Sequence, residues 1–151
     1  MSRVLVLSAL ILTASAVVAQ SPPASQQKWP NYAAIPAEVA KQQNPVKSSS
    51  ESLARAKKWW TLDCTMCHGN DGNGKSDIAK DAKWPMKDFT DPATLKERTD
   101  GELFYIIKNG IDEMPPEGPR VKTEENWDLV NYVRSLAKKK AETASEQKPS
   151  S

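Results

Sequence analysis

The chain is constrained most by the pentapeptide Cys-Thr-Met-Cys-His at positions 64–68, which holds both cysteines and the single histidine of the 151-residue sequence. Two thiols separated by two residues and followed at once by an imidazole form the pattern that attaches a c-type haem. Each thiol adds across one vinyl group of the porphyrin, and the imidazole binds the iron as an axial ligand. The pattern therefore predicts one haem c with its iron, bound covalently through Cys64 and Cys67 and coordinated by His68.

Other roles of this pattern fit the chain less well. A thioredoxin-like dithiol sits in a βαβ context, and no strand-like segment precedes Cys64. A structural zinc site needs four ligands, whereas the sequence offers only two thiols and one imidazole. A disulfide between Cys64 and Cys67 would close too short a loop to constrain the unfolded chain.

The second axial ligand must be of another residue type, because a single histidine excludes bis-histidine ligation within the chain. A methionine thioether is a common ligand of haem c iron. Met66 lies inside the attachment turn and cannot reach the opposite face, and Met86 follows His68 by only 18 residues. Met114 precedes two prolines that fix φ and stiffen its loop. We therefore expect Met114 to be the second ligand, with Met86 as the alternative.

The first residues predict export. Arg3 precedes an apolar run and a small-residue stretch that ends at Ala19, which is the pattern of a cleavable signal peptide over residues 1–19. The apolar stretch Val4–Ala19 is 16 residues long, which is shorter than the about 20 residues that a membrane-spanning helix needs. We therefore expect cleavage after Ala19, which removes Met1, and a periplasmic or exported protein. An uncleaved N-terminal membrane tether is the alternative.

Composition divides the remaining chain into three parts. Residues 20–47 are rich in Pro, Ser and Gln and are expected to form a linker or an extended wrap over the surface. Three of their side chains could pin this segment locally: Trp29, Tyr32 and Ile35. Residues 138–151 form a charged tail with nothing to bury, and we expect this tail to be disordered. The folded domain is therefore expected at residues 48–137.

The first expected helix of this domain leads into the haem-attachment motif at residues 64–68. Ser48 and Glu51 form a capping-box pattern, and the apolar face of the helix that follows ends at Cys64. Three glycines then predict a loop close to the porphyrin, because glycine permits positive φ: Gly69, Gly72 and Gly74.

Further helix signals follow. Asp91-Pro92 predicts a short helix through Leu95, and Thr99 with Glu102 forms a second capping box. Asn109-Gly110 ends that second helix. Thr123 caps a last helix, which carries an apolar stripe at helical spacing: Leu129, Tyr132, Val133 and Leu136. Because no segment has a convincing strand pattern, the sequence predicts an all-α domain of about four helices around one haem.

The charge balance excludes some classes of partner. The chain has 21 basic and 19 acidic residues, which argues against nucleic acid or a strongly charged membrane surface as partner. Trp84 and Lys87 are candidate contacts to a haem propionate. Lysines near the haem mouth are candidates for a docking surface: Lys75, Lys80, Lys83, Lys87 and Lys108.

Together these motifs resemble the monohaem class I cytochrome c family of small bacterial periplasmic proteins, whose helices form a cytochrome c-like fold. The matching segments follow the family's order: Trp60 to Gly74, Ile107 to Ile111, Met114-Pro115-Pro116, and Trp127 to Leu136. The resemblance implies that the first and last helices cross near one haem edge, where Trp60 meets Tyr132. The family often has glycine eight residues before the first cysteine, where this chain has Ala56, so the crossing is expected to be slightly wider.

The expected function is electron transfer without an enzymatic reaction. Iron held by His68 and Met114 has no open position for a substrate, so the chain is expected to shuttle single electrons between exported or membrane-bound redox partner proteins. We expect a monomer that associates with a membrane only if its N-terminus stays uncleaved. The alternative is a haem c subunit permanently bound to a dehydrogenase or terminal oxidase complex. A five-coordinate enzyme or gas sensor would require Met114 to be displaced.

Overall fold

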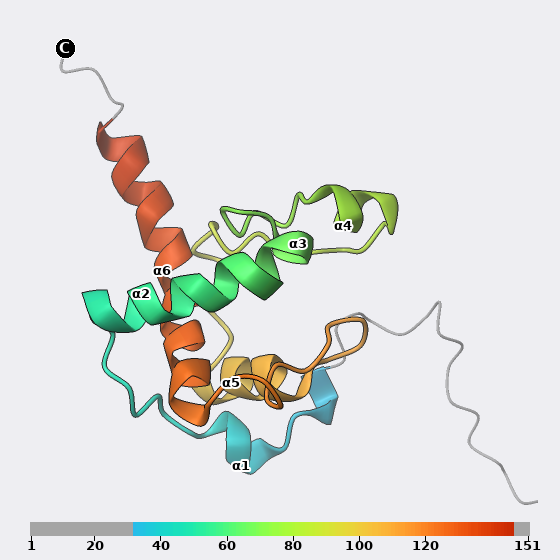
Figure 1. The fold of residues 1–151 in the computed structure, drawn as a ribbon, viewed down its shortest axis with the longest axis vertical. Coiled ribbons are helices and arrows are strands. Elements are labelled where there is room, and N and C mark those ends of the chain that lie inside the picture. Colours follow the sequence, from blue (N-terminus) through green and yellow to red (C-terminus); the bar gives the residue numbers. More distant parts are fainter. Residues whose placement is uncertain (1–31, 147–151) are drawn as a thin grey trace, which may run out of the picture.

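The structure is a computed structural model that describes residues 32–146 of the chain (Figure 1). The predicted signal peptide and Trp29 lie outside these residues. The elements in chain order are η2 (Tyr32–Ala34), α1 (Ala37–Ala40), α2 (Ser50–Trp59), η3 (Trp60–Cys64), α3 (Thr65–His68), α4 (Asp77–Asp81), α5 (Asp100–Asn109) and α6 (Thr123–Glu146). Between residues 32 and 146 there is no β-strand, only an isolated bridge between Ile111 and Met114. The all-α prediction is confirmed.

Three longer helices build the core. α2 crosses α6, and α5 packs against α6 on the other side of the domain (Figure 1). At the crossing, Ala56 is fully buried, and the rings of Trp60 and Tyr132 lie 5.5 Å apart between centroids. These two aromatic residues therefore meet as the resemblance implied. Between α5 and α6, Phe104 stacks on Trp127 at 4.0 Å.

The starts of α2 and α6 differ from the prediction by one residue. Ser49 rather than Ser48 caps α2, and its reciprocal partner is Ser52 rather than Glu51. Ser52 is buried, so its hydroxyl needs a hydrogen-bond partner, which the capping box supplies. α6 begins at Thr123 itself, so Thr123 is its first helical residue and not its cap. The capping box of Thr99 and Glu102 and the stop at Gly110, with φ of 74°, are confirmed.

The short helix predicted from Asp91-Pro92 is absent, because residues 92–97 form turns. The carboxylate of Asp91 accepts a hydrogen bond from the backbone N–H of Ala93 at 2.9 Å, and such a local bond competes with a helix. Arg134 of α6 donates to the backbone carbonyls of Leu95 and Arg98. These bonds hold the segment as turns against α6.

The last helix is longer than predicted. α6 continues through Glu146, whereas the sequence predicts a disordered tail from residue 138. Lys, Ala and Glu, which dominate this stretch, have high helix propensity. Extending an existing helix needs no new nucleus, so a polar segment can remain helical without a core of its own. Residues 147–151 lie outside the described part.

Residues 32–47, called the strap below, lie along α5 and α6 instead of leading away from the domain. The side-chain amide of Asn44 donates to the backbone carbonyl of Trp127 at 3.1 Å and to Oδ1 of Asn131 at 3.0 Å. Asn131 in turn donates to the backbone carbonyl of Val46 at 2.9 Å. Of the two expectations for this segment, the strap has the form of the extended wrap (Figure 1). Across residues 32–146, no helix combines the length and apolar character needed to cross a membrane.

Candidate functional site

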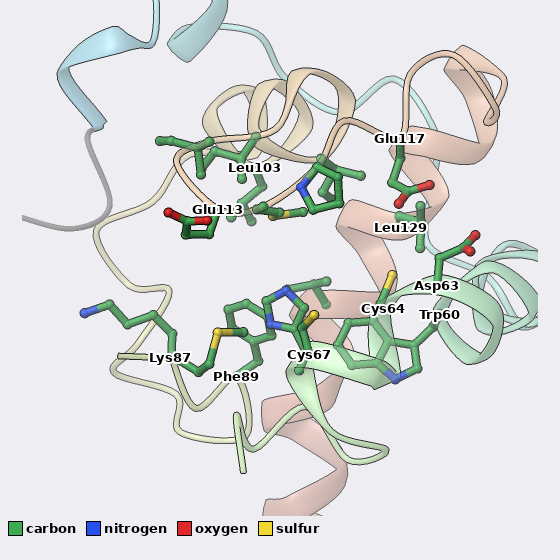
Figure 2. A pocket seen from close by; sticks show the side chains of 18 of the residues that line it. Trp60, Asp63, Cys64, Cys67, Lys87, Phe89, Leu103, Glu113, Glu117 and Leu129 are labelled. Atoms are coloured by element: carbon green, nitrogen blue, oxygen red, sulfur yellow. The ribbon is translucent and has the colours of Figure 1, made fainter. Parts of the chain in front are cut away.

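The predicted haem residues line one cavity, which lies between α5 and the attachment segment. This segment consists of η3 and α3, residues 60–68. Cys64, Cys67 and His68 line the cavity, together with the three methionines Met66, Met86 and Met114. Figure 2 shows the two cysteines on one wall, facing Leu103 and Glu113 across the opening. Much of the remaining lining is apolar, as burial of a porphyrin requires, and includes Trp60, Leu103, Ile107, Leu129 and Val133.

The attachment wall begins with a π-helical turn. In η3 the backbone carbonyl of Trp60 accepts from the N–H of Thr65, five residues on, and such wide turns occur often at functional sites. Cys64 and Cys67 are both free thiols. Ser76 donates a hydrogen bond to the carbonyl of Cys67 at 2.8 Å, which anchors the turn. Gly69 ends the segment with φ of 79°, as its position predicted.

The imidazole of His68 is held between aromatic rings. It stacks on Phe89 at 5.0 Å with 29° between the ring planes, and it lies 5.9 Å from the ring of Trp60. Burial lowers the pKa of His68 to about 4. The ring is therefore neutral at physiological pH, which is the protonation state that a metal ligand requires. Its Nδ1 atom is buried without a hydrogen-bond partner in the described part of the chain.

The opposite wall is formed by the loop between α5 and α6. Met114 exchanges two backbone hydrogen bonds with Ile111, at 2.9 and 3.1 Å, and its side chain packs against the buried core. Glu117 donates its backbone N–H to the carbonyl of Ile107 at 2.9 Å, which closes the loop back onto α5. At Gly110 an added Cβ would collide with the carbonyl of Met114. The loop therefore holds Met114 in one place.

Met86 lies on the other side of the cavity. Its Cβ would be 2.9 Å from a Cβ added to Gly74, and Gly74 donates its backbone N–H to the carbonyl of His68 at 2.9 Å. Met86 therefore belongs to the wall that carries His68. Of the two methionines expected as possible ligands, Met114 is the one on the wall that faces His68.

The thiol of Cys64 lies in a buried, acidic environment. Burial raises its pKa to about 12, with further contributions from the negative charges of Glu117 and Asp63. A thiol with such a pKa stays protonated at neutral pH and is a poor nucleophile. The environment of Cys64 therefore disfavours the thiolate on which a redox-active dithiol depends.

An ion cluster beside Cys64 was not predicted from the sequence. Arg120 binds Asp63 at 3.0 Å and Glu117 at 2.7 Å, and both carboxylates line the cavity. Glu117 itself is buried. Figure 2 shows the side chains of Asp63 and Glu117 next to Cys64. The cluster joins the attachment segment to the loop that carries Met114.

Comparison with known proteins identifies the family. Residues 53–137 match the family model of cytochrome c, which is more than half of the 151 residues. The chain belongs to the cytochrome c family. Membership implies a covalently bound haem c with iron and a role in electron transfer. The residues of this cytochrome fit such a group, since two free thiols and a neutral imidazole with no hydrogen-bond partner at Nδ1 share one largely apolar cavity in the described residues.

One solved structure similar to this cytochrome is the reducing HAO-like protein complex of Kuenenia stuttgartiensis, with a TM-score of 0.54 and 24% sequence identity. The match covers 61% of this chain and 46% of that one, so this chain spans less than half of its neighbour's length. At this identity the likeness concerns the fold alone. No match was found among curated proteins.

Several residues of the cavity had no local signal in the sequence. Phe89, which stacks on His68, follows no recognisable motif, and Arg98 stands among other charged residues, directly after Lys96 and Glu97. Trp84 and Lys87, predicted as candidate propionate contacts, both line the cavity. Of the five lysines considered for docking, Lys87 is the one that lines it.

Proposed function

We propose that this chain is an electron-transfer protein with one haem c, bound through Cys64 and Cys67 and coordinated by His68 and Met114. The observation that carries the proposal is that these four residues line one cavity from two facing walls. When bound, the haem supplies one-electron redox chemistry, its iron alternating between the ferrous and ferric states. We propose further that electrons pass singly between exported or membrane-bound redox partners.

The protein residues would have three tasks. His68 and Met114 hold the iron from both sides, which leaves no open position for a substrate. Cys64 and Cys67 prevent loss of the group by two carbon–sulfur bonds. The aromatic residues Trp60 and Phe89 fix the plane of His68 and exclude water from it. A soft thioether ligand stabilises the ferrous state and raises the reduction potential.

The experiment that tests the proposal uses protein matured in a host that attaches haem c. Mass spectrometry is expected to find one haem covalently bound, and the ferric protein should have the weak long-wavelength absorption band of methionine ligation. In Met114→Ala the band should disappear and the reduction potential should fall, whereas Met86→Leu should keep both. A wild-type protein without bound haem, or a band that survives in Met114→Ala, would contradict the proposal.

A permanently bound haem subunit is the second candidate. Leu62 is 71% exposed and Met66 57% exposed, and both belong to the attachment segment. An apolar surface of this kind suits a lasting interface as well as a brief encounter. Size-exclusion chromatography of protein from native cells distinguishes the two, because a free carrier elutes at the mass of one chain and a subunit with its complex.

Export is proposed on the sequence of residues 1–19 alone. N-terminal sequencing of the purified protein tests it. A mature chain that begins at Gln20 supports a periplasmic carrier, whereas a chain that keeps these residues and sediments with membranes supports a tethered one.

A further inference from the structure

The strap lies outside residues 53–137, which match the family, yet its first side chain lines the haem cavity. We propose that Tyr32 is a positioning residue of the haem pocket, which holds the cation of Arg98 at the cavity and closes this part of the pocket against water. The proposal rests on the proposed function, because it assigns part of the control of the haem's reduction potential to the strap.

The contact between Tyr32 and Arg98 is direct. The guanidinium carbon of Arg98 lies 4.3 Å from the centroid of the Tyr32 ring, which is the geometry of a cation–π interaction. Glu102 binds the same guanidinium at 3.0 Å, so Arg98 is held by one residue of the strap and one of α5. Both Tyr32 and Arg98 line the cavity. Tyr32 is half-buried, and this burial raises the pKa of its phenol against the opposing effect of Arg98.

The charges around the cavity are the reason why the position of Arg98 should affect the reduction potential. Asp63 lies beside Cys64, and Glu113 and Glu117 lie on the facing wall (Figure 2). Arg120 pairs with two of these acidic residues, Asp63 and Glu117, and the cavity lining in the described residues contains the cations Lys87 and Arg98. A positive charge at the cavity disfavours the ferric state, which carries one more positive charge than the ferrous state. Fixing Arg98 at the cavity should therefore raise the reduction potential.

The strap is fixed to α5 by a close approach at Gly101. A Cβ on Gly101 would collide with the backbone carbonyl of Val39 and would lie 3.0 Å from the carbonyl of Gln42. Thr99 also donates its hydroxyl to the carbonyl of Ala40 at 2.7 Å. The strap backbone therefore rests directly on the first turn of α5, a few residues from Tyr32. Any side chain at position 101 should push the strap away.

The test measures the reduction potential of full-length, matured variants by spectroelectrochemical titration. Tyr32→Ala should lower the potential, because Arg98 loses one of its two supports and water reaches the haem. Tyr32→Phe keeps the ring and should keep the potential. Glu38→Ala is the matched control, since Glu38 is exposed on the strap and pairs with Lys41 at the surface. An unchanged potential in Tyr32→Ala, or an equal fall in Tyr32→Phe, would overturn the proposal.

Gly101→Ala gives a second, independent test. Alanine favours helices more than glycine, so without the strap this change should raise the free energy of unfolding. With the strap in place, Gly101→Ala should instead lower both the stability and the potential. Adding Tyr32→Ala to it should lower the potential no further, because both changes act on the same contact. A stabilised Gly101→Ala with unchanged potential would contradict the role of the strap.

Failure of the assignment of Tyr32 can be distinguished from failure of the proposed function. Each variant is first examined for covalent haem and for the absorption band of methionine ligation. If the unaltered protein lacks them, the proposed function fails. If it has them and the potentials do not move, only the assignment of Tyr32 fails.

Discussion

At Gly72 the loop after the attachment segment passes directly against the crossing of α2 and α6. Its φ is +76°, and an added Cβ would lie 2.5 Å from Cδ1 of Leu136 and 3.4 Å from the ring of Trp60. A side chain here is therefore disfavoured twice, by the left-handed backbone and by the absence of space. This explains at the level of atoms why glycine stands at this position.

Gly72→Ala should lower the free energy of unfolding by about 1–3 kcal/mol. Denaturation of the haem-loaded protein by guanidinium chloride measures the effect. Asn70→Ala is the control, since Asn70 is exposed in the same loop. A loss in Gly72→Ala no greater than that in the control would mean that Leu136 can move aside without cost.

Between elements, the crossing of α2 and α6 contains an ion pair as well as aromatic rings. Arg55 of α2 binds the two carboxylate oxygens of Asp128 at 2.7 and 3.1 Å, and Asp128 is fully buried. Arg55 reaches Glu124 at 3.6 Å. A buried carboxylate that loses its partner is strongly destabilising, so the stability of this crossing depends on Arg55.

Arg55→Gln should therefore lower the urea midpoint of unfolding clearly. Lys57→Gln removes an exposed charge from the same helix and should change the midpoint little, because exposed charges contribute little. Equal midpoints in the two variants would show that water or a neighbouring group replaces Arg55 without loss.

The cluster of Arg120, Asp63 and Glu117 connects the attachment segment to the loop between α5 and α6 that carries Met114. Asp63→Asn breaks one ion pair, whereas Arg120→Gln breaks two and leaves the buried carboxylate of Glu117 without its cation, so Arg120→Gln should destabilise the protein more. Their effects on the reduction potential should be opposite. Loss of the cation favours ferric haem and lowers the potential, whereas loss of the carboxylate raises it.

Spectroelectrochemical titration of both variants measures these shifts. Lys80→Gln, which removes an exposed lysine that pairs with Asp77 at the surface, controls for the change in net charge. Shifts in the same direction in Arg120→Gln and Asp63→Asn would mean that displacement of the loop, not charge, sets the potential.

Contacts within one element were predictable from the sequence, and contacts between elements mostly were not. The capping box at Thr99 and the stop at Gly110 follow from residues a few positions apart, and both are confirmed. Arg134 is 39 residues from Leu95, whose carbonyl it binds, and no local pattern announces such a pair. For this reason the turns after Asp91 were mistaken for a helix.

The residues of the candidate site also divide into those that a local sequence pattern predicts and those that it does not. Cys64, Cys67 and His68 are recognisable because attachment of haem c requires a fixed local spacing, and Met114 is favoured by the stiff segment after it. Phe89 and the strap residue Tyr32 reach the cavity only through packing. Their residue types are common, and nothing in their spacing distinguishes them from other surface aromatic residues.

In the whole molecule, the helices form two walls around a cavity that extends into the core. Trp60 and Leu129 belong both to the buried core and to the cavity lining, as do Leu103, Ile107 and Val133. The haem would therefore be part of the hydrophobic core, and not an addition to a core that is already complete. Folding and cofactor attachment should be strongly coupled.

Removal of the haem tests this coupling. Cys64→Ala/Cys67→Ala protein, which cannot hold the group covalently, should lose its cooperative thermal transition and much of its helical circular dichroism after the haem is extracted. The reason is that the large apolar side chains of both walls would face water or an unfilled space, which costs free energy in proportion to the area exposed. Wild-type protein taken through the same extraction keeps its bound haem and serves as the control. If the haem-free variant unfolds cooperatively at the wild-type temperature, the helices and the strap are sufficient for the fold, and the cavity is a rigid site that the haem enters without adding stability.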